Sequence, residues 1–346
     1  MVVIEGLVGK GLLLLAPAKK QTNKTVLIGG KQCEIHDGIV RVLVLHDEVT
    51  DSPPDPESTL QEIRQKKLPV DIFTFLQKPS EPLPKFPYHL EKDNLAVLEI
   101  STWTNWFRRQ VHPNTRTNIR KAAKKGLVVR IEPFGDHITA GLVEVFNEAP
   151  IRRGRRYPYY GWDAEMVNRT WAIQLDQSSW VVAYYRESFV GFIKLIVGEG
   201  TARTSGTVAK EAHRDKCPMN ALLSECVRLC ASMGIRLLVY GKFTYGRKGE
   251  TSLTEFKKHN GFKKLEVPRY YIPLTMRGRI GLRLGLHHSL IDVIPGPVQR
   301  TLLKLRSRWY EAQKPVLATL DKQAGQEKVA SPLPGEGVTL WNAPPK

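Results

Sequence analysis

The sequence predicts an α+β protein built on a mixed, mostly antiparallel sheet that is flanked by helices. From residue 127 the patterns follow the order strand, helix, helix, strand, strand, strand, helix, strand, helix, strand. Three of these strands, at 180–186, 189–197 and 201–209, are joined by turns of two or three residues and form a meander. The stretch 201–234 then passes from strand through a polar loop to an amphipathic helix, which places a helical layer beside the sheet.

Composition limits the size of the protein and the charge of its partners. The 346 residues suffice for two domains or one enlarged domain, and a hydrophobic fraction of 42% is normal for a globular chain. The net charge of +18 indicates an anionic partner, which is a nucleic acid, an anionic membrane surface or a phosphorylated substrate.

The chain has only four cysteines, and two of them, Cys226 and Cys230, lie one helical turn apart on a predicted buried face. Because no CxxC pair or matching His cluster accompanies them, we expect no metal, and we expect buried, reduced thiols in a cytoplasmic protein. No segment approaches the roughly 20 apolar residues of a membrane span. Residues 12–15 are too short for a signal sequence, so peripheral contact with the inner membrane face is the only membrane association we consider.

The first hundred residues read as a small αβ lobe. The glycines of 6–11 lack the spacing of a P-loop, and no Ser or Thr follows Lys10. Prolines at 79–87 mark an irregular connector. The predicted strands are 26–28, 39–45, 70–77 and 96–100, and the predicted helix is 57–67.

Aromatic and basic residues interleave after residue 100. Ser101 is a candidate N-cap for a helix that starts at Thr102, His112-Pro113-Asn114 interrupts it, and a second helix ends at Gly126. Such a stripe either binds a nucleic-acid backbone or consists of core aromatics beside a solvated face. The residues are Trp103, Trp106, Phe107, Arg108, Arg109, Arg116, Arg120, Lys121, Lys124 and Lys125.

A strand is predicted at 127–134, and two helices capped by Asp136 and Asp163 follow it. A turn-rich segment at 150–162 joins these two helices. It sets arginines beside aromatic residues, and loops carry function more often than cores do. We expect this segment to form the wall that contacts an acceptor substrate, although a surface loop with aromatic anchors would look the same. The candidate residues are Arg152, Arg155, Arg156, Tyr159 and Tyr160.

The loop 211–217 precedes a helix that begins at Pro218 and ends before Gly234. It carries His213, Arg214 and Lys216 just before the helix N-terminus, where free N–H groups and the macrodipole attract anions. The stretch therefore predicts a phosphate seat. An ordinary strand-to-helix crossover with a solvated basic loop is the alternative.

Further elements follow this helix. A buried strand is expected at 235–240, a short helix with a capping box of Ser252 and Glu255, and a final strand at 263–274. Residues 276–314 are basic, and one face of a helix there either lies on an anionic membrane or docks on the protein. We divide the chain into an N-terminal lobe (1–100), a central domain (101–275), basic C-terminal helices (276–320) and a disordered tail (321–346).

The order of elements over 127–274 resembles the GNAT acyltransferase fold. Two stretches are similar to the Fem-type branch, which includes peptidoglycan aminoacyltransferases. The basic stretch 116–126 (RTNIRKAAKKG) resembles its entry helix, and 252–262 (SLTEFKKHNGF) resembles its join between the last helix and strand. Because Fem-type enzymes often duplicate the GNAT unit, the resemblance implies that 1–100 are a degenerate first copy.

The loop 213–220 (HRDKCPMN) departs from the GNAT pattern, because it lacks the glycines that wrap the pyrophosphate of coenzyme A. Fem-type loops are also poor in glycine, and those enzymes take the acyl group from aminoacyl-tRNA. The resemblance therefore leaves two donors open, acyl-CoA and aminoacyl-tRNA. The residues expected to hold the donor are His213, Arg214, Lys216, Asn220 and Lys242, and Arg247 is a further cation near them.

Acyl transfer to an amine needs an oriented donor, a neutral amine and a stabilised oxyanion. The resemblance implies that strand 201–209 splays away from strand 235–240 and offers backbone N–H groups to the oxyanion. Glu148 or His213 is the candidate base, and Tyr245 or Tyr240 the candidate acid.

Three functions remain open from the sequence. The first is a Fem-like N-acyltransferase that acts on an amine acceptor, such as a cell-envelope sugar or peptide, with no stable binding to DNA. The second is a non-catalytic basic protein that binds nucleic acid. The third is a scaffold on an anionic membrane surface that uses residues 276–314.

Overall fold

The computed structural model describes residues 3–4, 24–50, 55–152, 154–245 and 251–288, together with residues 301, 305 and 308. The predicted tail 321–346, almost all of the basic region beyond residue 288, and Arg247 lie outside these residues.

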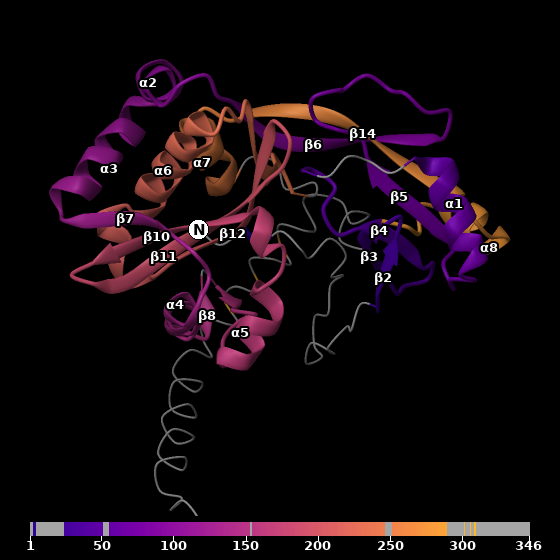
Figure 1. Cartoon of the computed structure of the whole chain (residues 1–346), viewed down its shortest axis with the longest axis horizontal. Helices are drawn as coiled ribbons and strands as arrows, with labels where there is room; N and C mark the ends of the chain where they lie inside the picture. The colour runs from indigo at the N-terminus through magenta and orange to yellow at the C-terminus, as the bar shows by residue number, and fades with distance from the viewer. Residues whose placement is uncertain are drawn as a thin grey trace, which may run out of the picture.

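One large sheet runs through the described residues and is mostly antiparallel, as predicted (Figure 1). Its order is β2-β3-β4-β5-β14-β6-β13-β12-β11-β10-β7, with the short β1 beside β12, and a separate hairpin pairs β8 with β9. The strands are β1 Val3–Ile4, β2 Lys24–Ile28, β3 Lys31–His36, β4 Val42–Leu45, β5 Ile72–Leu76, β6 His89–Glu99, β7 Leu127–Glu132, β8 Ile151–Arg152, β9 Arg155–Arg156, β10 Ser178–Tyr185, β11 Ser188–Val197, β12 Thr201–Ala209, β13 Leu237–Lys242 and β14 Lys263–Pro273.

The two halves of this sheet repeat one motif. In each half three consecutive strands pair antiparallel, β2-β3-β4 and β10-β11-β12. The third strand then pairs in parallel with the strand that follows it in the chain, β4 with β5 and β12 with β13. A parallel pair needs a crossover, and helices α1 (Pro56–Gln65) and α6 (Pro218–Ser232) supply it. The long strands β6 and β14 lie between the halves (Figure 1). The N-terminal half therefore shares this strand arrangement with the C-terminal half, and its origin as a degenerate copy stays a prediction.

The splay expected between the central strands is present. Strands β12 and β13 pair only from Thr201↔Leu237 to Arg203↔Val239 and then separate. The pairing of β13 with β6 also shifts its register after Val239. The last residues of β12 and β13 therefore form two limbs, and between them β1 pairs with β12 at Val3↔Thr207 and Ile4↔Gly206.

Helices cover both faces of the C-terminal half (Figure 1). One face carries α2, α3, α6 and α7 and holds a core that includes Trp106, Leu222 and Tyr240. The opposite face carries α4 and α5 and an aromatic core. The remaining helices are α2 Trp103–Asn105, η1 Trp106–Gln110, α3 Pro113–Lys124, α4 Asp136–Phe146, α5 Ala164–Trp171, η2 Leu175–Gln177, η3 Glu211–Lys216, α7 Ser252–His259 and α8 Met276–Arg283.

Several predicted boundaries are wrong for identifiable reasons. Strand β6 starts at His89 rather than 96, because its polar first half pairs with β14 instead of facing a core. The N-cap of α2 is Thr102, one residue after the predicted cap Ser101, and the N-caps of α4 and α7 are Gly135 and Thr251, each one residue before the predicted cap. The Thr102 and Thr251 hydroxyls accept backbone N–H bonds. Helix α5 ends at Trp171, whereas the helix predicted there runs to about residue 177.

Candidate functional site

The basic turn expected at the start of α6 is the 3-10 helix η3, which follows β12 directly. The Lys216 ammonium lies 4.5 Å from the ring centroid of Tyr185. Asp215 pairs with Lys125 at 2.7 Å and with Lys216 at 3.3 Å, and these bonds lower the pKa of Asp215 to about 2. Asp215 thus holds Lys216 of the turn and Lys125 at the end of α3 in place.

The Glu148 side chain binds the backbone of this turn. Its carboxylate accepts the N–H groups of Glu211 at 2.9 Å and Ala212 at 3.0 Å. It also accepts a bond from the buried guanidinium of Arg152 at 2.8 Å, which donates further to the carbonyls of Val145 and Ala209. These contacts make Glu148 an anchor between α4 and η3 and argue against its predicted role as the base.

The N-terminus of α6 keeps its positive character. Cys217 is the N-cap, with a left-handed φ of +54°, and no side chain caps the helix or places an acidic group in its first turn. The N–H groups of Asn220 and Ala221 bond to the Cys217 carbonyl. Asn220 therefore lies in the first turn, beside the predicted phosphate seat.

His213 is partly buried in the same turn, and its ring lies 5.6 Å from that of Tyr185. Among the described residues its Nδ1 atom has no hydrogen-bond partner. Burial lowers the pKa of His213, and the charges of Lys216 and Lys210 lower it further. The ring is therefore neutral near pH 7, as a base must be.

The other limb of the splay ends in a group that sequence reasoning missed. Lys257 of α7 is fully buried, and its ammonium donates to the Lys242 carbonyl at the end of β13. The ammonium also lies 5.4 Å from the Tyr240 ring centroid and 4.9 Å from that of Tyr245. The predicted acids Tyr240 and Tyr245 thus share one buried cation. The Phe-Lys pair at 256–257, within the Fem-like stretch 252–262, is the sequence signal that could have identified this position.

Lys242, predicted to meet phosphates, is half-buried and pairs with Asp93 at 3.0 Å. Arg214 lies in η3 with the other cations of the turn. The predicted donor residues therefore fall into two groups, one at the end of β12 and one at the end of β13. Their contact with a donor stays a prediction.

The Arg-Tyr segment is divided between the interior and the surface. Arg152 and Tyr159 are buried, and Tyr159 stacks on Phe146 with a centroid distance of 4.7 Å. These two residues belong to the aromatic core beneath α4 and α5, so they do not line an exposed wall. Arg155, Arg156 and the half-buried Tyr160 remain candidates for acceptor contact.

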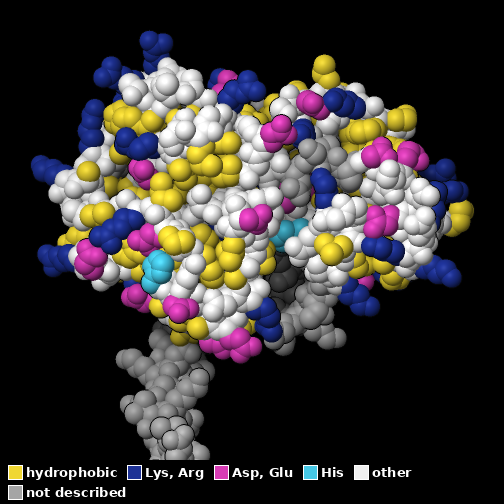
Figure 2. Space-filling view, in the orientation of Figure 1, with side chains coloured by type: hydrophobic (Ala, Val, Ile, Leu, Met, Phe, Trp, Pro, Cys, Tyr) yellow, Lys and Arg dark blue, Asp and Glu magenta, His cyan; other side chains and the backbone are white. Residues whose placement is uncertain are grey.

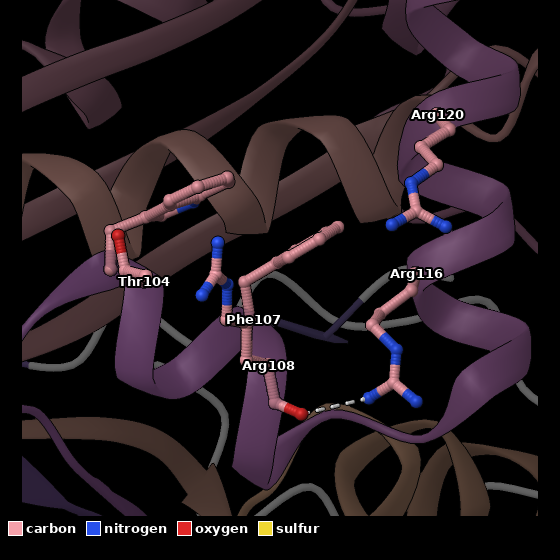
Figure 3. Close-up of a pocket in the computed structure, with 6 residues that line it drawn as sticks. Thr104, Phe107, Arg108, Arg116 and Arg120 are labelled. Atoms are coloured by element: carbon pink, nitrogen blue, oxygen red, sulfur yellow. Dashed lines mark hydrogen bonds between the residues drawn. The ribbon is translucent and has the colours of Figure 1, made fainter.

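A separate surface pocket lies where α2, η1 and α3 meet, beside α6 (Figure 3). It has a volume of about 410 Å³, and its lining includes three arginines and no acidic residue. The Trp103 and Phe107 rings stack at 4.9 Å, with Arg228 over Trp103 at 4.3 Å and Arg120 over Phe107 at 5.4 Å. The lining residues are Trp103, Thr104, Phe107, Arg108, Arg116 and Arg120.

The conformation of η1 and two hydrogen bonds position the side chains of this pocket. Residues of η1 form a π-helical turn, which is rare and occurs frequently at functional sites. The Arg108 carbonyl there accepts a bond from Arg116 at 3.3 Å (Figure 3). The Trp103 indole N–H donates to Ser224 of α6 at 3.0 Å and fixes the ring.

Helix α3 connects the pocket to the basic turn. It begins beside Arg116 in the pocket wall, and Lys125 just past its end pairs with Asp215 of η3. Its twelve residues span roughly 18 Å at 1.5 Å per residue. Dark blue side chains mark this corner of the surface in Figure 2. The cations of α3 thus run from one site to the other.

Comparison with known proteins supports the fold. No family model and no curated protein matches the chain. The solved structure of FemX is 8% identical and aligns over 78% of this chain and 89% of that chain, with a TM-score of 0.52. Two further matches are the C-terminal domain of a putative lysylphosphatidylglycerol synthetase from Agrobacterium fabrum (15% identity, 76% and 88% coverage, TM-score 0.48) and a tandem GNAT protein from the clavulanic acid biosynthesis pathway (10%, 71% and 80%, TM-score 0.40).

At such low identity these likenesses show the fold alone, which is the Fem-like arrangement of the GNAT fold. Among the described residues no helix is both long and apolar enough to cross a membrane.

Proposed function

We propose that this chain, with its Fem-like GNAT fold, is an aminoacyltransferase that moves an aminoacyl group from tRNA to an amine acceptor. The fold and the splayed strands support acyl transfer in general. The observation that carries the choice of donor is the position of Glu148. Its carboxylate accepts the backbone N–H groups of Glu211 and Ala212 at the start of the turn, so these two groups are not available to a pyrophosphate. A turn with fewer free N–H groups is less suited to coenzyme A, which is held by such groups in the GNAT pattern.

A polyanion fits the remaining cations better than a small cofactor does. A tRNA strand that enters near the arginine pocket can follow α3 and reach the turn, and a base can replace Arg228 on the Trp103 ring or Arg120 on the Phe107 ring. The α6 N-terminus and Lys216 then hold a phosphate near the ester that reacts.

The roles in the reaction follow from the two limbs of the splay. Neutral His213 takes the proton from the attacking amine, and the backbone N–H groups of β12 beyond its pairing with β1, together with the buried ammonium of Lys257, stabilise the oxyanion. Tyr245 returns a proton to the leaving ribose oxygen. The acceptor approaches past Arg155, Arg156 and Tyr160, and a cell-envelope sugar or peptide fits this description.

Binding and transfer measured on the full chain test the proposal. We expect bulk aminoacyl-tRNA to bind in fluorescence anisotropy at a salt concentration where acetyl-CoA shows no heat in calorimetry. We also expect the protein to transfer labelled amino acid from tRNA to an amine-containing extract of cell envelope. Tight acetyl-CoA binding without tRNA binding would contradict the choice of donor.

The stacked pocket also favours a second candidate, a nucleic-acid-binding protein without catalysis. Such a protein would bind charged and uncharged tRNA equally and leave the aminoacyl ester intact. The transfer measurement separates the two functions.

A further inference from the structure

A second cluster of reactive side chains lies outside the site, at the first residues of β6. His89 and Glu91 alternate along this strand and so project from the same face. His287 and His288 reach them from the turn that follows α8. One oxygen of Glu91, Oε1, lies 2.9 Å from Nε2 of His287, 3.3 Å from Nε2 of His288 and 3.5 Å from Nε2 of His89.

The spacing of these atoms suits a tetrahedral metal. The ligand atoms of Glu91, His287 and His288 all lie within 4.8 Å of one another. Around zinc, with bonds of about 2.0–2.1 Å, neighbouring ligand atoms are separated by roughly 3.3 Å. A small inward movement of the side chains would therefore place an ion at bonding distance from all three.

The surroundings hold the ligands in position. The His287 side chain is only 2% exposed, and its ring packs edge-on against Tyr271 of β14 at 4.6 Å. Burial raises the pKa of Glu91, but the bonds from His287 and His288 outweigh it and lower the pKa overall, so the carboxylate is charged. An anionic oxygen beside imidazole nitrogens is a donor set that zinc and similar borderline cations prefer.

The optional fourth ligand borders a cavity. His89 lines a cavity of about 310 Å³ together with Pro273, Arg279, Leu282 and Arg283. A water molecule in this cavity can therefore take the place of His89 as the fourth ligand.

We propose that Glu91, His287 and His288 bind one divalent cation of the zinc type, with His89 or water as the fourth ligand. The ion would fasten the segment after α8 to the edge of β6. The sequence predicted no metal, because these ligands are 196 positions apart and form no local motif. Only the pairing of β6 with β14 and the position of α8 bring them together.

Metal titration of the full chain tests this site. We expect one zinc per chain by elemental analysis of the protein before chelator treatment, and, after the metal has been removed, micromolar or tighter zinc binding in calorimetry and a rise in melting temperature on adding zinc. Cobalt should give the intense visible absorption of a tetrahedral complex. Glu91→Gln and the double variant His287→Ala, His288→Ala should each weaken zinc binding by at least about a hundredfold.

His46→Ala is the matched control. His36 and His46 also surround one carboxylate, Glu34, at 3.4 and 2.8 Å, but these three residues do not meet the spacing that a shared ion needs. This variant should bind zinc as the wild type does. Absence of stoichiometric zinc in the wild type, or equal binding by the Glu91→Gln variant, would overturn the proposal. Circular dichroism in the absence of metal verifies that each variant is folded.

Discussion

At the residue scale, the structure gives single side chains roles that their sequence positions do not reveal. A lysine in a helix that reads as amphipathic is normally solvated, yet Lys257 is fully buried. Burying an ammonium is costly unless it is satisfied, and here one carbonyl and two tyrosine rings surround it. This cost indicates that the charge is retained for a purpose.

We predict that Lys257→Met lowers aminoacyl transfer by about 100- to 1,000-fold, the usual effect of losing one oxyanion-stabilising group. The affinity for aminoacyl-tRNA should change little, because Lys257 is fully buried and donates to a backbone carbonyl instead of facing tRNA phosphates. Single-turnover transfer at saturating tRNA measures the effect. Lys194→Met is the matched control, since Lys194 is equally buried but donates to the Trp171 and Ile173 carbonyls on the opposite face. Equal losses of transfer in both variants would show a structural role only.

His213 should make stability depend on pH. Burial, Lys216 and Lys210 lower its pKa in the folded protein, whereas the unfolded chain has the ordinary value of about 6.5. The unfolded state therefore binds a proton more readily. The stability contribution is fully present above about pH 6.5 and is lost as the pH falls through the lowered folded pKa.

Urea unfolding at pH 7.5 and pH 5.5 measures this dependence. We expect His213→Gln to reduce the loss of stability between the two pH values relative to the wild type. Parallel losses in variant and wild type would contradict the assignment of the neutral ring.

At the element scale, periodic segments were predictable and irregular ones were not. Helix α6 begins at Pro218 and meander strands β11 and β12 lie close to their predicted ranges, because apolar spacing and short turns define them. Strand β3 was missed, since its polar residues hide the alternation. The splay was predicted from resemblance rather than from periodicity, and the ring stack of Trp103 on Phe107 depends on a π-helical turn that no pattern announces.

The same argument applies to the candidate site. His213, Arg214 and Lys216 are adjacent in sequence, so the basic turn could be found from the sequence alone. The anchoring of Glu148 on that turn joins positions 63 and 64 residues apart and required the fold. The Arg-Tyr segment misled, because four aromatics in a turn-rich stretch also satisfy the needs of a core.

The arginine pocket allows a prediction about salt. If Arg116 and Arg120 each contact one phosphate, replacing either with Gln should lower the slope of log K against log salt by about 0.7–0.9. Trp103→Ala should weaken tRNA binding by about 1–3 kcal/mol through lost stacking and leave the slope unchanged. Anisotropy titrations with tRNA at several salt concentrations measure both quantities. A change of slope in Trp103→Ala, or none in the arginine variants, would contradict the docking path.

At the scale of the whole molecule, buried charges join the two halves. Arg269 of β14 binds Glu48, just after β4, through two bonds of 2.9 and 2.6 Å, and Asp93 of β6 at 3.1 Å. Asp47 also bonds to Arg203 at 2.9 Å, at the point where β12 leaves β13. The segment after β4 is thus tied to the base of the splay in the other half.

The charge network predicts that the halves unfold together. Arg269→Met leaves the partly buried carboxylate of Glu48 and the buried carboxylate of Asp93 without their shared cation, which should cost about 3 kcal/mol of unfolding free energy. Lys264→Met is the control, because its pair with Glu266 is exposed to solvent and contributes little to stability. All seven tryptophans follow residue 102, so their fluorescence reports the C-terminal half and its extension, whereas circular dichroism reports the whole chain. In the wild type the two signals should give one coincident transition in urea, and in Arg269→Met the circular dichroism transition should begin first, as the N-terminal half loses its anchor. Separate transitions already present in the wild type would mean that β6 and β14 connect the halves without coupling them.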